Sequence, residues 1–145
     1  MKRSGESGVA AIEFAVLLPV LVLIVLGIIE FGILLYNQQV ITNASREGAR
    51  HGIKNENGVY YQSSSIEDVV KNYIYPQYPS TNPSRLITLS NSPVPATLTV
   101  TTGTSCSSFG NDLEIDVRFQ SSFLVMDNFG FNNPDLTAKT IMRCE

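Results

Sequence analysis

The sequence predicts an α+β protein in which a long N-terminal transmembrane helix carries a small extracytoplasmic head. Three observations predict this fold. An apolar segment of membrane length begins at Phe14, a short segment of helical periodicity follows near Ile66, and segments of alternating apolar and polar residues occupy the C-terminal part. We expect the head to hold a mainly antiparallel sheet of three or four strands and one short helix.

The apolar segment is long enough to cross a bilayer. All 16 residues from Phe14 to Ile29 are apolar, glycine or proline, and after Glu30 the run resumes over Phe31–Tyr36. As one helix, residues 14–36 would be about 34 Å long, and a hydrocarbon core is about 30 Å thick. We therefore predict one span over about residues 14–36, inside a helix over residues 9–53 that Pro19 kinks.

The charges that flank the span predict its orientation. Lys2 and Arg3 precede the apolar run, with Glu6 as the only acid before it, and this favours a cytoplasmic N-terminus and an extracytoplasmic head. A cleaved signal peptide is the alternative. The run exceeds the usual apolar core of about 7–15 residues, however, and no small-x-small cleavage site follows it before Asn37.

Charge and composition exclude several functions. The formal net charge is −3, and no segment interleaves basic and aromatic residues, so nucleic acid is not an expected partner. We predict no enzymatic activity, no cofactor and no metal. His51, the single histidine, is interpreted as a solvated residue at a helix end, and the sequence has neither a CxxC motif nor a glycine-rich phosphate loop after a strand.

The two cysteines, Cys106 and Cys144, predict a disulfide if the head lies outside the cytoplasmic membrane. Closing a loop of this length would stabilise the fold by roughly 4 kcal/mol in the chain-entropy model. The alternative is a pair of free thiols in a reducing compartment.

Beyond the apolar run the helical pattern persists. Val40, Ile41, Ala44 and Gly48 lie on one stripe, which would pack on the protein's own head or on another helix. Gly52 and the Asn55–Gly58 cluster are expected to end the helix. The short helix of the head covers Ile66–Ile74; Ser65 and Asp68 resemble a capping box before it, and Pro76 ends it.

The rest of the head is predicted to be β-structure. Alternation predicts strands over residues 96–101, 113–119 and 136–145, with a short edge strand over residues 86–89. In the second of these, Glu114, Asp116 and Arg118 share the face opposite four apolar residues, which indicates a solvated outer face rather than a pair of catalytic acids.

Glu13 is the least expected residue of the N-terminal region. It stands at the start of the membrane-length run, five residues after Gly8. A charged side chain at the centre of a spanning helix costs about 2.5–3.5 kcal/mol, and less near the interface. An ionisable residue in such a segment therefore indicates a functional site.

The spacing Gly8, four residues, then Glu13–Phe14 resembles the processing motif of type IV prepilins. With Pro19, the Gly27–Gly32 segment and the Ala44–Arg50 segment, it resembles the TadE-like pilin family of tight-adherence (Flp) pilus systems. The resemblance covers about residues 8–52 and extends to the head only in general plan.

This resemblance implies that a prepilin peptidase cuts between Gly8 and Val9. Residues 1–8 would then be the leader, residues 9–53 the helix and residues 54–145 the head. Glu13 would become the fifth residue of the mature chain and, with Phe14, form an assembly site. There the carboxylate would pair with the free N-terminal amine of a neighbouring subunit. Glu30 is either a second pairing residue or a solvated residue near the outer interface of the membrane.

By the same resemblance the protein is a minor pilin or pseudopilin of a tight-adherence pilus or a related secretion system. Major Flp pilins generally have little or no head. The expected partners are prepilin peptidase, other pilins or pseudopilins, membrane lipid and the pilus assembly machinery. The expected location is the bacterial cytoplasmic membrane, single-pass, with incorporation into a pilus. The alternative is an uncleaved single-span protein with an extracytoplasmic binding domain.

Overall fold

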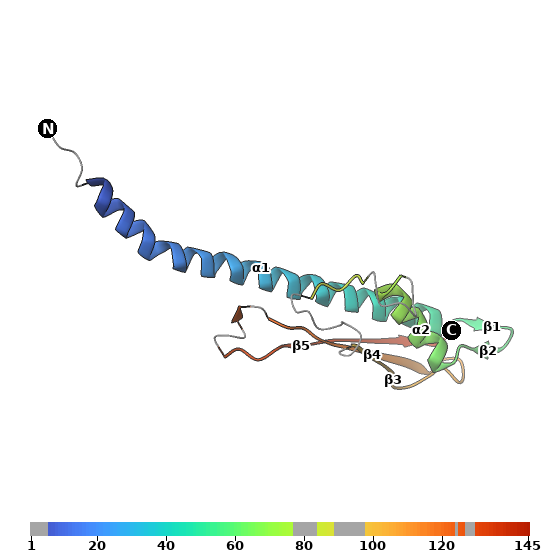
Figure 1. Cartoon of the computed structure of the whole chain (residues 1–145). Coiled ribbons are helices and arrows are strands. Elements are labelled where there is room, and N and C mark those ends of the chain that lie inside the picture. Colours follow the sequence, from blue (N-terminus) through green and yellow to red (C-terminus); the bar gives the residue numbers. More distant parts are fainter. Residues whose placement is uncertain (1–5, 77–83, 89–97, 124, 127–129) are drawn as a thin grey trace.

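The computed structural model describes residues 6–76, 84–88, 98–123, 125–126 and 130–145. Figure 1 shows one long helix whose C-terminal half carries a small head, while its N-terminal half extends away from it. The predicted α+β class is confirmed. In chain order the elements are α1 (Glu6–Gly52), β1 (Asn55–Glu56), β2 (Val59–Tyr60), α2 (Ser63–Ile74), β3 (Leu98–Thr102), β4 (Asp112–Gln120) and β5 (Asp135–Arg143).

Helix α1 is 47 residues long and continues through Pro19. It curves gently along its length, as Figure 1 shows. Every residue from Gly8 to Val25 is exposed, and Leu26 is the first whose side chain is half-buried. The helix is long and apolar enough to cross a membrane. The second part of the predicted span, from Leu26 onward, therefore lies beside the head rather than free of it.

Strand β4 is the centre of an antiparallel sheet with the order β3-β4-β5. In its register Val117 is opposite both Val100 of β3 and Ala138 of β5. The apolar residues of β4 are fully buried and alternate with residues that are exposed or half-buried, as the alternation in the sequence predicted.

The core lies between the sheet, α2 and the C-terminal half of α1. Helix α1 contributes the stripe that the sequence predicted, and this stripe packs on the chain's own head. The buried apolar residues of the core include Val40, Ile41, Ala44 and Ala49 of α1, Ile66, Val70 and Ile74 of α2, Leu113, Ile115, Val117 and Phe119 of β4, and Ala138 of β5.

Two glycines allow α1 to approach the head closely. A Cβ atom on Gly48 would collide with Cγ2 of Val70, and one on Gly52 would lie 2.6 Å from the side chains of both Ile66 and Leu113. These neighbours are buried and leave no room for an added methyl group. The small residues of α1 therefore set the distance between helix and head.

The strands β1 and β2 form a two-stranded hairpin that the sequence analysis missed. Asn57 and Gly58 lie between them, and both have positive φ, at 57° and 81°. An Asn-Gly pair with this geometry is typical of the type I′ turn of a two-residue hairpin. The sequence pattern indicated only that this pair follows the end of a helix.

Two further local expectations were wrong. Residues 86–88 form no strand, and residue 89 lies outside the described residues. The backbone of Ile87 instead bonds to the fully buried side chain of Asn37, which donates to Ile87 O (2.7 Å) and accepts from Ile87 N (2.9 Å). Helix α2 has Gln62 at its N-cap without a side-chain capping bond, so the Ser65–Asp68 box is not used.

The close approach of α1 predicts how Gly48→Ala affects stability. Alanine gains about 1 kcal/mol of helix propensity over glycine, but overpacking a buried contact costs roughly 1–3 kcal/mol. We expect the variant to lower the melting temperature of the head, measured by circular dichroism in detergent.

Gly32→Ala is the matched control, because no described atom lies within 4 Å of a Cβ placed there. It should leave the melting temperature unchanged or raise it. Equal effects of the two substitutions would contradict the role assigned to Gly48.

Candidate assembly site on the N-terminal helix

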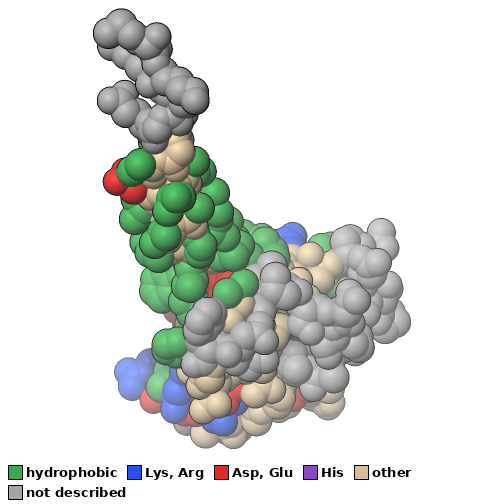
Figure 2. Space-filling model, turned by 60° about the vertical axis from the view of Figure 1, so that its left-hand side comes forward, with side chains coloured by type: hydrophobic (Ala, Val, Ile, Leu, Met, Phe, Trp, Pro, Cys, Tyr) green, Lys and Arg blue, Asp and Glu red, His purple; other side chains and the backbone are tan. Residues whose placement is uncertain are grey.

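The residues predicted to form the assembly site lie on the free half of α1, by which we mean its exposed part from Gly8 to Val25. Gly8, Val9, Glu13 and Phe14 are all exposed, and so is the helix surface around them. Figure 2 shows hydrophobic side chains covering this part of the helix on the face in view. Within the described residues, Glu13 has no hydrogen bond or ion pair to the rest of the chain. A carboxylate on an apolar helix without an internal partner needs one from another molecule when water is removed.

The peptide bond between Gly8 and Val9 lies inside the first turns of α1, because the helix begins at Glu6. A glycine in a helix interior is destabilising by roughly 0.5–1 kcal/mol relative to alanine. Unwinding this turn therefore requires less free energy with glycine at position 8 than it would with alanine.

Glu30 differs from Glu13 in its surroundings. Its side chain is only 4% exposed. Oε1 accepts a hydrogen bond from the backbone N–H of Val125 (2.6 Å), and Oε2 accepts one from the N–H of Met126 (3.3 Å). Hydrogen bonds of this kind offset the desolvation of a buried carboxylate. A role for Glu30 in pairing between subunits stays a prediction.

The Ala44–Arg50 segment has two different faces. Ala44, Ser45, Gly48 and Ala49 are buried against the head, and the Ser45 hydroxyl lies 2.7 Å from that of Thr140 on β5. The charged residues of the segment, Arg46, Glu47 and Arg50, are exposed. Its small residues are therefore used for packing within the chain, and its charged residues remain available to other molecules.

The predicted disulfide between Cys106 and Cys144 is confirmed, with Cα atoms 5.8 Å apart. Cys144 is fully buried just after β5, and Cys106 lies in the connection between β3 and β4. Two backbone bonds support the same junction, from Gly110 N to Cys144 O and from Cys144 N to Asn111 O. The bridge thus ties the end of the chain to the end of the sheet that is far from the free half of α1.

Reduction of this disulfide should destabilise the head. In the chain-entropy model a loop of 38 residues contributes roughly 4 kcal/mol, so we expect a large drop in melting temperature when a reductant is added to the wild-type protein. A Cys106→Ser/Cys144→Ser double variant should melt at that lower temperature with or without reductant. A wild-type melting curve that reductant does not move would contradict this role.

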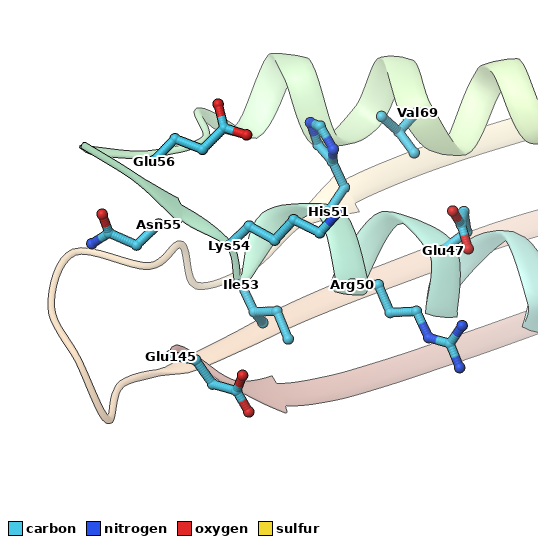
Figure 3. A pocket seen from close by; sticks show the side chains of 9 residues that line it. All are labelled: Glu47, Arg50, His51, Ile53, Lys54, Asn55, Glu56, Val69 and Glu145. Atoms are coloured by element: carbon cyan, nitrogen blue, oxygen red, sulfur yellow. The ribbon is translucent and has the colours of Figure 1, made fainter. Parts of the chain in front are cut away.

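A hollow of about 900 Å³ lies at the far end of α1, and Figure 3 shows its lining. Charges of both signs surround it, from Glu47, Arg50, Lys54, Glu56 and Glu145. No group of three potential metal ligands occurs among the described residues. The lining residues do not pair a nucleophile with a base, and their charges do not favour either an anionic or a cationic ligand. The hollow therefore indicates no particular reaction or ligand.

His51 also lines this hollow, and its environment differs from the expected one. Its ring centroid lies 4.1 Å from that of Tyr61, and its Nε2 lies 3.4 Å from the hydroxyl oxygen of Ser65. It is half-buried at the junction of α1 and α2 rather than solvated.

The charged residues of the outer sheet face pair with one another. Lys139 binds Glu114 (2.7 Å), and Arg118 binds Asp116 (2.8 Å). The bond to Asp116 raises the pKa of Arg118. These ion pairs explain the two acids as part of a solvated face, as the alternation predicted.

The fold and the exposed apolar helix indicate a class of protein, a membrane-anchored protein with one long N-terminal helix and a small α+β head. Residues 8–50 match the family model described as TadE-like protein, so the resemblance expected from the sequence is confirmed and the chain is TadE-like over this segment. No curated protein and no solved structure showed significant similarity.

The matched segment covers the whole candidate site and most of the part of α1 that packs on the head, but it ends before Gly52. It indicates involvement in Tad pilus assembly, together with other components of the pilus. The long apolar helix indicates membrane anchoring.

Proposed function

We propose that this chain is a minor pilin- or pseudopilin-like structural subunit of a Tad pilus or a related secretion system. In this proposal prepilin peptidase removes residues 1–8, and the helix from Val9 serves first as membrane anchor and then packs against other pilins. The subunit is single-pass, with its N-terminus in the cytoplasm and its head outside, and it acts without catalysis of its own.

The observation that carries this proposal is the contrast between the two glutamates of the apolar segment. Glu30 is buried and bonded within its own chain, whereas the carboxylate of Glu13 is exposed on a helix with no internal partner among the described residues. Burying a charge is tolerable only when it is paired with good geometry. The N-terminal amine that cleavage creates on another subunit is such a partner.

The geometry of one helix supports this pairing. After cleavage the amine of Val9 would lie about 6 Å along the helix axis from Glu13, at 1.5 Å per residue. A neighbouring subunit displaced by about that distance would bring its amine beside the carboxylate. The exposed apolar side chains between Val9 and Val25 would then form the helix–helix contact.

The head supports a minor rather than a major role. The described part of the head contains a disulfide, and α2 and β4 pack closely on α1 at Gly48 and Gly52. Such a head would be displayed beside the helix wherever the subunit enters the filament.

Cleavage is tested by expressing the full chain with the prepilin peptidase of its own system and analysing the membrane protein by intact mass and N-terminal sequencing. We expect a chain that begins at Val9. Gly8→Val should block processing, because a β-branched side chain would have to enter a groove suited to glycine. A wild-type chain that still begins at Met1 would sink the pilin proposal and favour an uncleaved anchored protein.

The role of Glu13 is tested by Glu13→Ala in cells that make the pilus. We expect the variant to be processed and to keep a folded, disulfide-bonded head, but pilus assembly should fall strongly. Glu47→Ala is the matched control, since it removes an exposed carboxylate from α1 outside the apolar segment. Undiminished piliation in Glu13→Ala cells would show that the charge pair is not needed.

A further inference from the structure

We infer that the head touches the membrane a second time, through apolar side chains of the connection between β4 and β5. We call four of these residues the interfacial cluster: Phe131, which is exposed, and Phe123, Val125 and Met126, which are half-buried. The proposed partner of the cluster is the lipid of the outer leaflet. The inference requires α1 to lie in a membrane but does not require the pilus role. It therefore survives if the cleavage test fails.

Contacts with α1 place the cluster beside the apolar segment. The N–H groups of Val125 and Met126 bond to Glu30, and Cε of Met126 lies 3.5 Å from the position of a Cβ on Gly27. Asn37, which the head also contacts, is about 10 Å further along the helix axis from Glu30. The connection thus extends from the head toward the membrane side of the molecule, as Figure 1 shows.

The level of these contacts corresponds to the edge of a bilayer. Because the head covers α1 from Leu26 onward, we place the span over Val9–Ile29 instead of the residues 14–36 expected from the sequence. This part of the helix is about 31 Å long, close to the thickness of a hydrocarbon core of about 30 Å. Such a placement puts Glu30 at the outer boundary of the core. Ile29 and Phe31, on either side of Glu30, are 50% and 59% exposed, so apolar helix surface faces outward at the level of the cluster.

The backbone of the connection suits a poorly hydrated environment. Irregular chain at membrane depth requires its polar groups to be satisfied by protein. Besides the two bonds to Glu30, the N–H of Ser121 bonds to Pro134 O, that of Phe123 to Asn133 Oδ1 and that of Phe131 to Met126 O. These five bonds satisfy backbone donors of the connection within the protein, as contact with lipid would require.

The side chains point to lipid as the partner. Phe131 is 58% exposed, and from Ser121 to Pro134 the sequence holds one charged residue, Asp127. Apolar side chains at this level gain free energy by entering the boundary between headgroups and acyl chains. Met126 adjoins the apolar segment of α1 at Gly27, and this proximity favours lipid over a separate protein partner.

The absence of tryptophan from the sequence allows a direct test. A Phe131→Trp reporter in the full chain would be reconstituted into vesicles of phosphatidylethanolamine and phosphatidylglycerol, with and without brominated acyl chains in both leaflets. We expect a blue-shifted emission, most of which is lost in the brominated vesicles. Phe109→Trp is the matched control, because Phe109 is 83% exposed near the disulfide end of the head; its emission should be unchanged.

Equal emission of the two reporters in the two kinds of vesicle would overturn the inference. So would a blue shift of the Phe131→Trp reporter that resists bromine and appears only at high protein-to-lipid ratio, since a second protein copy would then cover it. Circular dichroism melting of each variant verifies that the head is folded.

The role of Glu30 is tested in the same reporter background. Glu30→Ala removes both acceptors of the connection and should restore most of the emission in brominated vesicles. Glu30→Gln retains the shape of the side chain but directs its NH₂ group at one of the two backbone donors. It should therefore also restore emission in brominated vesicles. Quenching that neither substitution changes would show that Glu30 does not position the cluster.

Discussion

The packing of one helix in two environments is the constraint on which this structure depends. From Gly8 to Val25 α1 is exposed all round, as lipid or other apolar helices require, and from Leu26 to Gly52 the same helix packs one side against the head. Gly48 and Gly52 make this packing close, because any side chain at either position would enter the buried space of α2 and β4. The head therefore packs closely on the helix that carries it.

The two glutamates show how the same residue type takes different roles along this helix. Glu30 has its two oxygens bonded to backbone N–H groups of the head, so its charge is used to hold a connection against α1. Glu13 lies beyond the reach of the head, on the part of α1 with no other described element beside it. The first contributes to the structure of the monomer, and the second is suited to interaction between molecules. Their difference arises from where the head ends along α1.

Several features were predicted from the sequence because they depend on neighbouring residues. Helical spacing identified the stripe of α1, and alternation identified the buried face of β4, since both periodicities are local. Other features were missed for different reasons. The Asn57–Gly58 hairpin has a recognisable signal, but its two strands are too short to show alternation. Asn37 bonds to Ile87, fifty residues away, and no local pattern could show that this contact replaces an edge strand.

By itself the sequence determined the apolar helix, the position of Glu13 after Gly8, the TadE-like character of residues 8–50 and the presence of two cysteines. These follow from composition and spacing along one segment. Only the tertiary structure decided that Cys106 meets Cys144, that Glu30 binds the β4–β5 connection and that the head covers α1 from Leu26 onward. Each of these depends on how the sheet folds back along the helix, which brings together residues that lie far apart in the sequence.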